Sequence, residues 1–165
     1  MKKKIIISLF IIFVIIITGS ILIYHQATKN QQTQESIAVE RAKEYVNISE
    51  VKKVTSFHYM DSYYIIEAVN ENSEDIIIWI PEEKNKEVLI KNAKDGISKE
   101  EAMDLLVNGL DNFSNNQRPK NIINIKLGMV DDVPVYEITY RDQKDRYSFI
   151  YIDFYNGDWY RVYNF

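Results

Sequence analysis

The feature of this sequence that most constrains its fold is a repetition of the chain on itself after 72 residues. That shift places YYIIEAVNENSEDIIIWIPEE (63–83) on VYEITYRDQKDRYSFIYIDFY (135–155), and aromatic residues coincide, for example Trp79 with Tyr151. Self-similarity at a fixed distance is the sequence signature of repeated structural units. The match predicts an internal duplication, so any fold inferred for one copy must also serve the other.

Each copy has the same order of expected elements, one helix followed by four strands. Helical spacing of apolar residues begins at Ile37 and fades near Ser49 in the first copy, and a second helix is expected after Ser98. The strand-like runs are 51–59, 63–70, 75–80 and 86–90 in the first copy, and 122–129, 134–141, 147–155 and 159–165 in the second. A helix followed by an antiparallel meander predicts an α+β fold in which the helix covers one sheet face.

Local signals mark both ends of the second copy. Ser98 and Glu101 have the spacing of a capping box, in which each side chain accepts a hydrogen bond from the other residue's backbone amide. Four apolar residues then lie on one face of the expected helix, Ala102, Leu105, Leu106 and Leu110. Near the C-terminus, Asn156-Gly157 predicts a hairpin with a type I′ turn, in which both central residues need positive φ.

The N-terminal segment is predicted to cross a membrane. Ile5 to Ile23 is an uncharged apolar run that spans about 28 Å as a helix at ~1.5 Å per residue, close to a hydrocarbon core of roughly 30 Å. A cleaved signal peptide is the alternative, but its apolar core would have only about 7 to 15 residues. We expect a retained single-pass anchor, with Lys2 to Lys4 in the cytoplasm and the chain after Tyr24 outside.

Composition limits what the exported part can bind. Without the three N-terminal lysines, 17 basic residues face 24 acidic ones, a formal charge of −7 that disfavours nucleic acid and anionic headgroups. The chain has no cysteine, which excludes a lipoprotein anchor, disulfides and thiolate metal sites. We also expect no cofactor and no small-molecule substrate.

Catalytic groupings are also not recognisable in the sequence. The two histidines are far apart, His25 at the membrane exit and His58 on an expected strand. Asp131-Asp132 would suit a wall-cleaving glycosidase only as a pair in a cleft, and its position before Val133-Pro134 favours a turn. Asp153, just before the Asn-Gly pair, is interpreted as a structural carboxylate. We therefore expect a protein that is not an enzyme.

The pairing register of the second copy decides which residues share a sheet face. An even hairpin loop would place Tyr140 opposite Tyr147, Ile138 opposite Phe149 and Tyr136 opposite Tyr151. An odd loop would instead place Ile138 opposite Ile150 and Glu137 beside Tyr151. We expect the even register because it separates polar from aromatic residues better. The helix would then cover the aromatic face, and Ile150 and Ile152 would pack on the first copy.

The C-terminal strand holds the best candidates for binding a partner: Trp159, Tyr160, Tyr163 and Phe165. Tyr and Trp are enriched at the energetic centres of protein interfaces, and an edge strand can accept an added strand. The alternative is that these residues pack within the tandem.

Three stretches, WIPEEKNKEVL, AKDGISKEEA and EITYRDQKDRYSFIYIDFYNG, occur in this order behind an N-terminal anchor. Together they resemble the TseB-like (YpmB) proteins of Gram-positive bacteria, which contain PepSY-type repeats. The resemblance covers nearly the whole chain, and Trp79 to Gly157 carries its most specific part. PepSY repeats end in an Asp and a Gly-containing turn, as at Asp153 and Asn156-Gly157, whereas the first copy departs from this with Pro81.

The resemblance implies two tandem cystatin-like modules outside a single-pass anchor. The expected divisions are 1–23 for the cytoplasmic lysines and anchor, 24–35 for a polar stalk, 36–92 for the first module and 93–165 for the second. It also implies a regulator of cell-wall elongation that contacts a membrane-bound penicillin-binding protein. A PepSY-type peptidase inhibitor or chaperone at the cell surface is the alternative function.

Overall fold

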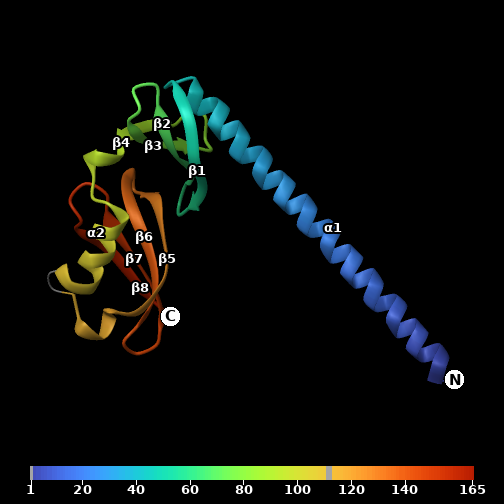
Figure 1. Cartoon of the computed structure of the whole chain (residues 1–165). Helices are drawn as coiled ribbons and strands as arrows, with labels where there is room; N and C mark the ends of the chain where they lie inside the picture. Colours follow the sequence, from blue (N-terminus) through green and yellow to red (C-terminus); the bar gives the residue numbers. More distant parts are fainter. Residues whose placement is uncertain (1, 111–112) are drawn as a thin grey trace. The chain divides into compact units, whose positions relative to one another are not determined.

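The structure is a computed structural model that describes residues 2–110 and 113–165, with side chains described from residue 11 onward. The chain forms two compact units, residues 1–37 and 38–165. The predicted α+β class is confirmed, with an apolar N-terminal helix followed by two antiparallel sheets (Figure 1). The domain boundaries proposed from the sequence remain predictions.

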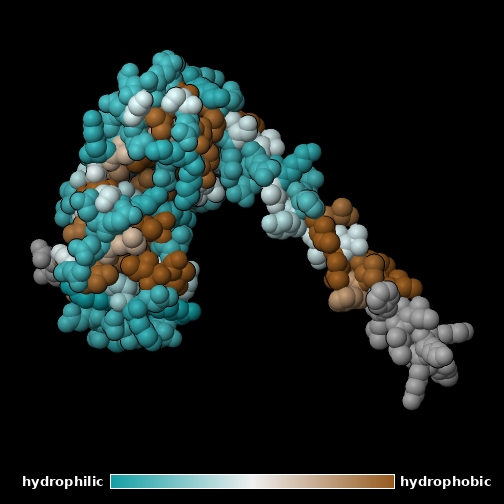
Figure 2. Space-filling view, in the orientation of Figure 1, coloured by the Kyte–Doolittle hydropathy of each residue, from teal (hydrophilic) through white to brown (hydrophobic). Residues whose placement is uncertain are grey.

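The first unit consists of most of α1 (Lys2–Lys43), a single helix of 42 residues. Within the described part of the chain, it is the one helix long and apolar enough to cross a membrane. Figure 2 shows apolar side chains next to the grey N-terminal residues, followed by a hydrophilic stretch. That hydrophilic stretch includes the predicted stalk, 24–35, which is also helical. An exposed apolar helix of this length is consistent with the expected single-pass anchor.

The first sheet is an antiparallel meander of four strands in the order β1-β2-β3-β4. Its strands are β1 (Ile48–His58), β2 (Ser62–Asn70), β3 (Asp75–Pro81) and β4 (Leu89–Asn92). One face packs on the last turns of α1 through the buried residues Ala38 and Ala42. These small side chains allow the helix to lie close to Ile66, Ile78 and Ile80, all at most 1% exposed.

The second sheet repeats the meander in the order β5-β6-β7-β8. Its strands are β5 (Pro119–Val130), β6 (Val133–Asp142), β7 (Tyr147–Asp153) and β8 (Trp159–Asn164). The helical segments before it are η1 (Ala93–Asp95), α2 (Lys99–Asp104), the π-helical η2 (Leu105–Gly109) and η3 (Asn115–Gln117). The capping box is confirmed, because Ser98 Oγ accepts from the Glu101 amide at 3.1 Å and Glu101 Oε2 accepts from the Ser98 amide at 2.7 Å.

The internal duplication is visible in the strand pairing. In the first sheet Ile65 lies opposite Trp79, and 72 residues later Glu137 lies opposite Tyr151. Both hairpins turn through three residues with the third in the left-handed region, Ser73 at φ 61° and Asp145 at φ 64°. The two copies therefore share both the pairing of these strands and the geometry of the hairpin loop that joins them.

The expected even register of the β6–β7 hairpin is wrong. Ile138 lies opposite Ile150 and Tyr136 opposite Ile152, which is the odd register. Asp142 causes the difference, since its Oδ1 accepts from the amides of Lys144 and Arg146, both at 2.9 Å, and fixes a three-residue loop. The hydrogen bonds of Asp142 in this turn therefore determine the register more strongly than the separation of polar from aromatic residues does.

The helix covers Tyr136, Ile138 and Tyr140 of β6 as expected, but on β7 it covers Ile150 and Ile152 and not the expected Phe149 and Tyr151. The face toward the helix carries Tyr136, Ile138, Tyr140, Ile150 and Ile152, all at most 3% exposed. Tyr136 donates its phenol hydrogen to the carbonyl of Ile97 at 2.8 Å, just before α2. The expectation that Ile150 and Ile152 need the first module as a cover is therefore wrong; Phe149 and Tyr151 point to that side instead.

The last hairpin is present, but its predicted turn type is wrong. Asp153 pairs with Asp158, so the loop has four residues, and of the Asn156-Gly157 pair Gly157 alone has positive φ, at 78°. The loop is longer because Phe154 turns inward, is fully buried and packs edge-on against Trp79 at 5.6 Å. A two-residue turn would have left this ring outside the core.

The two modules share one hydrophobic core. The Trp79 indole is fully buried and donates to the carbonyl of Gly128 at 2.9 Å. Phe57 lies directly over the same glycine, where a Cβ would come within 2.4 Å of its ring. The second face of the first sheet is thus covered by the second module.

Candidate functional site

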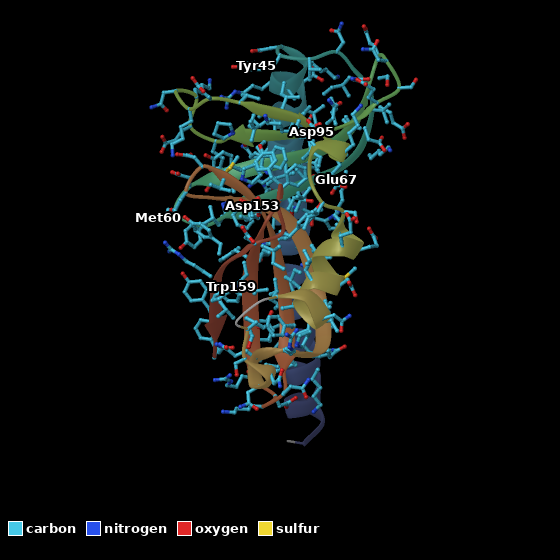
Figure 3. The ribbon with its side chains drawn as sticks, turned by 90° about the vertical axis from the view of Figure 1, so that its left-hand side faces the viewer. Tyr45, Met60, Glu67, Asp95, Asp153 and Trp159 are labelled. Carbon is cyan, nitrogen blue, oxygen red and sulfur yellow. The ribbon has the colours of Figure 1, made fainter. Side chains whose placement is uncertain are left out.

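The structure places the four predicted binding residues at one edge of the second sheet but divides them between its faces. Trp159 lies opposite Ile152 on the side of α2, and its ring meets Phe113 at 5.8 Å. Tyr163 and Phe165 lie on the other side, together with Phe149. Figure 3 shows Trp159 beside β8 in the second module. The quartet is therefore not one binding platform.

The side of the sheet away from α2 carries a connected set of rings, which we call the aromatic face: Tyr59, Phe149, Tyr151, Tyr163 and Phe165. Phe149 is central to it, with ring centroids 5.2 Å from Tyr163, 5.7 Å from Phe165 and 6.0 Å from Tyr151. Tyr59 reaches the face from the first module, 5.6 Å from Tyr151. Such offset and edge-on contacts stabilise ring clusters beyond the area they bury.

The aromatic face passes from the core to the surface along its length. Tyr151 is 3% exposed, Phe149 and Tyr163 are half-buried, and Phe165 is 74% exposed. Tyr147, at the start of β7, is also exposed and lies under the guanidinium of Arg141 at 5.4 Å. Contiguous apolar surface that continues a buried cluster is typical of a protein interaction site.

Polar contacts fix one border of the aromatic face. Arg161 donates to the Tyr59 phenol at 2.6 Å and lies 3.4 Å from Asp131, which also accepts from the Tyr160 phenol at 3.2 Å. A bulge in the β7–β8 pairing between Tyr151 and Ile152 brings Tyr160 and Arg161 to the same aspartate. This network ties β8 to the hairpin turns of β1–β2 and β5–β6.

Phenol ionisation follows the same contacts. The hydrogen bond from Tyr59, followed by that from Arg161, lowers the pKa of Tyr163. The bond to Tyr163 in turn raises the pKa of Tyr59. Burial, then the nearby Glu137, raises the pKa of Tyr151 well above its ordinary range. Tyr151 therefore remains protonated at neutral pH and contributes a hydrogen-bond donor and apolar surface.

The residues considered for catalysis have structural positions. Asp131 and Asp132 form the two-residue β5–β6 turn with φ of 49° and 62°, which confirms the turn interpretation. Asp153 accepts from the amides of Tyr155 and Asn156 at 2.7 and 3.2 Å. His58 contacts Ser62 at 2.8 Å. Over the described residues, no cluster of three or more His, Asp or Glu could hold a metal ion.

A groove of about 240 Å³ lies between the modules. Its walls carry the ion pair of Lys99 with Glu67 at 2.9 Å and the Tyr136 ring. Because Lys99 and Glu67 form an ion pair with each other, neither side chain is left unpaired to bind a charged ligand in the groove. The aromatic face is the stronger candidate site.

Sequence reasoning missed Tyr59, Phe149 and Tyr151 as members of the site. Phe149 and Tyr151, two residues apart on one strand, share a face in either register; the odd register places that face away from Tyr136, Ile138 and Tyr140, and therefore away from the helix. Tyr59 comes from the other module, and its position depends on docking between the copies, for which the sequence holds no local signal.

Comparisons with known proteins agree with this architecture. Residues 38–81 match the family model described as "Cell wall elongation regulator TseB-like domain", and residues 96–158 match "Peptidase propeptide and YPEB domain", PepSY. The two matches follow each other along the chain and confirm the resemblance inferred from its motifs.

Individual relatives show the same arrangement over most of the chain. The chain is 27% identical over 147 residues to "Probable cell wall elongation regulator TseB" of Bacillus subtilis (strain 168), covering 89% of this chain and 87% of that protein. The solved structure of "YpmB protein from Bacillus subtilis" superposes with a TM-score of 0.70 at 25% identity, covering 79% of this chain and 96% of that one.

Proposed function

We propose that this protein is a non-catalytic, membrane-anchored regulator of cell-wall elongation that binds a membrane-bound penicillin-binding protein outside the cytoplasmic membrane. The observation that carries the proposal is the similarity, over 89% of the chain, to a relative named as a probable cell wall elongation regulator. The partially exposed aromatic face on a buried scaffold supports binding as the mode of action.

The anchor supports a partner in the same membrane. A protein held by one apolar helix meets other membrane proteins at a raised effective concentration, so a modest interface can suffice. In the proposed topology Lys2 to Lys4 face the cytoplasm and the two modules lie outside. Protease added to intact spheroplasts should degrade residues 38–165; their protection would contradict this orientation.

The binding surface proposed for the partner is the β8 edge of the second sheet, where Tyr163 and Phe165 belong to the aromatic face and Trp159 and Tyr160 lie outside it. Trp159 and Phe165 are 39% and 74% exposed, and Tyr163 continues the aromatic face to the surface. Trp159 contacts Phe113 on the opposite side of the sheet, so we expect Tyr163 and Phe165 to dominate the interaction.

Photo-crosslinking in intact cells tests this surface. A photoreactive residue at Tyr163 or Trp159 should capture a penicillin-binding protein. Tyr45, which is 55% exposed and lies in the first module, is a matched aromatic control and should not capture it (Figure 3). Capture of nothing from Tyr163 and Trp159, or equal capture from Tyr45, would contradict the proposed surface.

The alternative function is that of a peptidase inhibitor or chaperone module. It is favoured by the match of residues 96–158 to a family described as a peptidase propeptide domain. The same crosslinking experiment separates the two proposals, because recovery of a protease without any wall synthase would support the alternative.

The non-catalytic part of the proposal has its own test. The purified protein should release no soluble fragments from isolated cell wall. Fragment release that disappears in Asp153→Asn would show hydrolase activity and overturn this part.

A further inference from the structure

The four sheet edges of this molecule differ in how they are protected from pairing with another strand. Exposed edges are usually blunted by lysine, proline, bulges or short length. β1 has two bulges and exposed Lys52 and Lys53, and β5 has two bulges, Pro119 and Lys120. β4 has four residues only. β8 is the exception, with Arg161 as its one charged residue and a single bulge at its start.

The backbone of β8 presents hydrogen-bonding groups on its open side. Phe165 donates its amide to the Tyr147 carbonyl at 2.9 Å, which fixes the hydrogen-bonded pairs of the β7–β8 ladder. Bonding alternates along an antiparallel strand, so the amides and carbonyls of Val162 and Asn164 point away from β7. Such a row of donors and acceptors fits the backbone of another extended strand.

Charge is distributed unevenly along this edge. Its start is acidic: Asp158 precedes the strand, and Asp131 and Asp132 lie at the turn contacted by Tyr160. Its end adjoins the β6–β7 turn, where Arg141 and Lys144 are exposed, Lys120 pairs with Asp145 at 3.6 Å, and Arg146 pairs with the buried Asp142, so that the basic side chains outnumber the acidic ones. An antiparallel second copy would bring the basic end of each strand to the acidic end of the other.

We propose that β8 pairs antiparallel with β8 of a second copy of this chain, joining two four-stranded sheets into one of eight strands. Two β8 strands can pair only if the residues whose backbone amides and carbonyls point away from β7 lie opposite each other. A register with Val162 opposite Val162 of the second copy satisfies this condition over residues 160–164. Asn164 then lies opposite Tyr160, and Arg161 opposite Tyr163. No like charges face each other in this register, and the contact is isologous, as a twofold dimer requires.

The interface is small and consequently weak. A single strand pair buries far less than the roughly 1,200 Å² of a stable complex, so the dimer should be populated mainly in the membrane, where the anchor concentrates both copies. Since backbone atoms form it, the side chains of the aromatic face remain available. The dimer goes beyond the proposed function, and either can fail without the other.

Cysteine crosslinking of the full chain in membranes tests the pairing, because the natural sequence has no cysteine. Val162→Cys should be joined to its counterpart by a short thiol-reactive crosslinker, since residues directly opposite each other in a sheet have Cβ atoms about 4.5–5.5 Å apart. Ile123→Cys is the matched control on β5, the other edge of the same sheet, and is 48% exposed. Val162→Cys should crosslink at least about tenfold faster; equal rates would overturn the proposal.

A proline variant supplies a second measurement. In Val162→Pro the lost amide hydrogen points away from β7, so the second sheet should remain folded, as checked by tryptophan fluorescence. Self-association of the full chain in detergent, measured by sedimentation equilibrium, should weaken at least about tenfold. Unchanged self-association would show that the anchor alone causes it. If the wild-type chain is monomeric at all concentrations and Val162→Pro no longer captures the penicillin-binding protein, the β8 edge binds that partner and not a second copy. Both outcomes contradict the β8–β8 dimer.

Discussion

The two sheets of this molecule have the same strand order and the same hairpin geometry, yet they differ in how much of each is covered. The first sheet packs on the end of α1 with one face and on the second module with the other, and six consecutive residues of β3, Ile76 to Pro81, are buried. The second sheet packs on α2 and the helical segment after it through Tyr136, Ile138, Ile150 and Ile152, while Phe57 and Tyr59 of the first module reach its other face. The uncovered part is the aromatic face.

This difference shows that two copies of one fold can have different roles, one buried as scaffold and the other with a face left exposed. Strands that correspond after 72 residues keep the same pairing in both copies. Their side chains differ because each sheet face has a different neighbour in each copy. In the first copy both faces of β3 are buried, one through Ile76, Ile78 and Ile80 and the other through Ile77 and Trp79. In the second copy one face of β7 carries aromatic rings that pass from the buried Tyr151, which donates to Glu137 at 3.0 Å, to the exposed Tyr147. Binding is therefore expected on the second copy.

The largest expected effect comes from removing the ring at the centre of the shared core. Trp79→Ala should lower the free energy of unfolding by about 3–5 kcal/mol, because it leaves a cavity and an unpaired Gly128 carbonyl. Trp159→Ala, on the partly exposed second sheet, should cost less than about 1 kcal/mol. Urea unfolding of both variants measures the contrast, and equal losses would mean that the two sheets are equally covered.

A smaller effect is expected where the modules dock. Gly128→Ala should cost about 1–3 kcal/mol, because the new methyl group would meet the Phe57 ring. Phe57→Leu removes part of that ring and should reduce the cost of Gly128→Ala in the double variant. A double-mutant cycle of unfolding free energies gives the coupling, and additive losses would contradict a direct contact.

The hairpin corners test whether the two copies are interchangeable. Asn70 accepts from the amides of Asn72 and Glu74 and donates to the Glu74 carboxylate, whereas Asp142 accepts from Arg146. Asn70→Asp should destabilise the first hairpin through repulsion with Glu74, and adding Glu74→Arg should restore it. Thermal unfolding measures both; failure of the second change to restore stability would show that the corners are not equivalent.

Acid should affect the two corners differently. Burial alone would raise the pKa of Asp142, but the amide and guanidinium of Arg146 and the amide of Lys144 hold it below its ordinary value of about 3.8. A lowered folded-state pKa means that the ionised Asp142 stabilises the fold above that value and that this contribution is lost as pH falls through the folded pKa. Asp142→Asn should flatten the acid limb of a melting-temperature profile below pH 4; an unchanged limb would exclude Asp142 as a cause.

The smallest effect on stability is expected on the aromatic face itself. Phe165 is 74% exposed, so Phe165→Ser should change the unfolding free energy by less than about 0.5 kcal/mol. The same variant should reduce crosslinking from Tyr163 to the partner several-fold, whereas Tyr45→Ser should not. Loss of stability together with loss of capture would mean that the aromatic face belongs to the fold.

The sequence was sufficient to predict elements whose determinants are local. The capping box at Ser98, the apolar helix and the eight strands all follow from spacing within a few residues, and each is present, although β4 starts three residues later than expected. The repeat distance also predicted the correspondence of β2 with β6 and of β3 with β7.

The register of β6 and β7 was predictable in principle but was decided by the wrong criterion. Segregation of aromatic residues favoured the even loop, whereas Asp142 imposed the odd one through two backbone hydrogen bonds. Asn70 stands at the same place in the first copy, so an Asx residue repeated after 72 positions was the available signal. The position of Tyr59 was not predictable, because it depends on how the modules dock.

Phe57 and Gly128 occupy the same ladder position in the two copies, Phe57 opposite Tyr63 and Gly128 opposite Val135. One copy therefore supplies the ring and the other the space that receives it. One ladder position cannot hold both a phenyl ring and a glycine, so a third module could not dock by the same contact. The first copy has Phe57 where a glycine would be needed, and the second copy has Gly128 where a ring would be needed. A head-to-tail contact that could in principle extend without limit is here restricted to a pair by one residue in each copy.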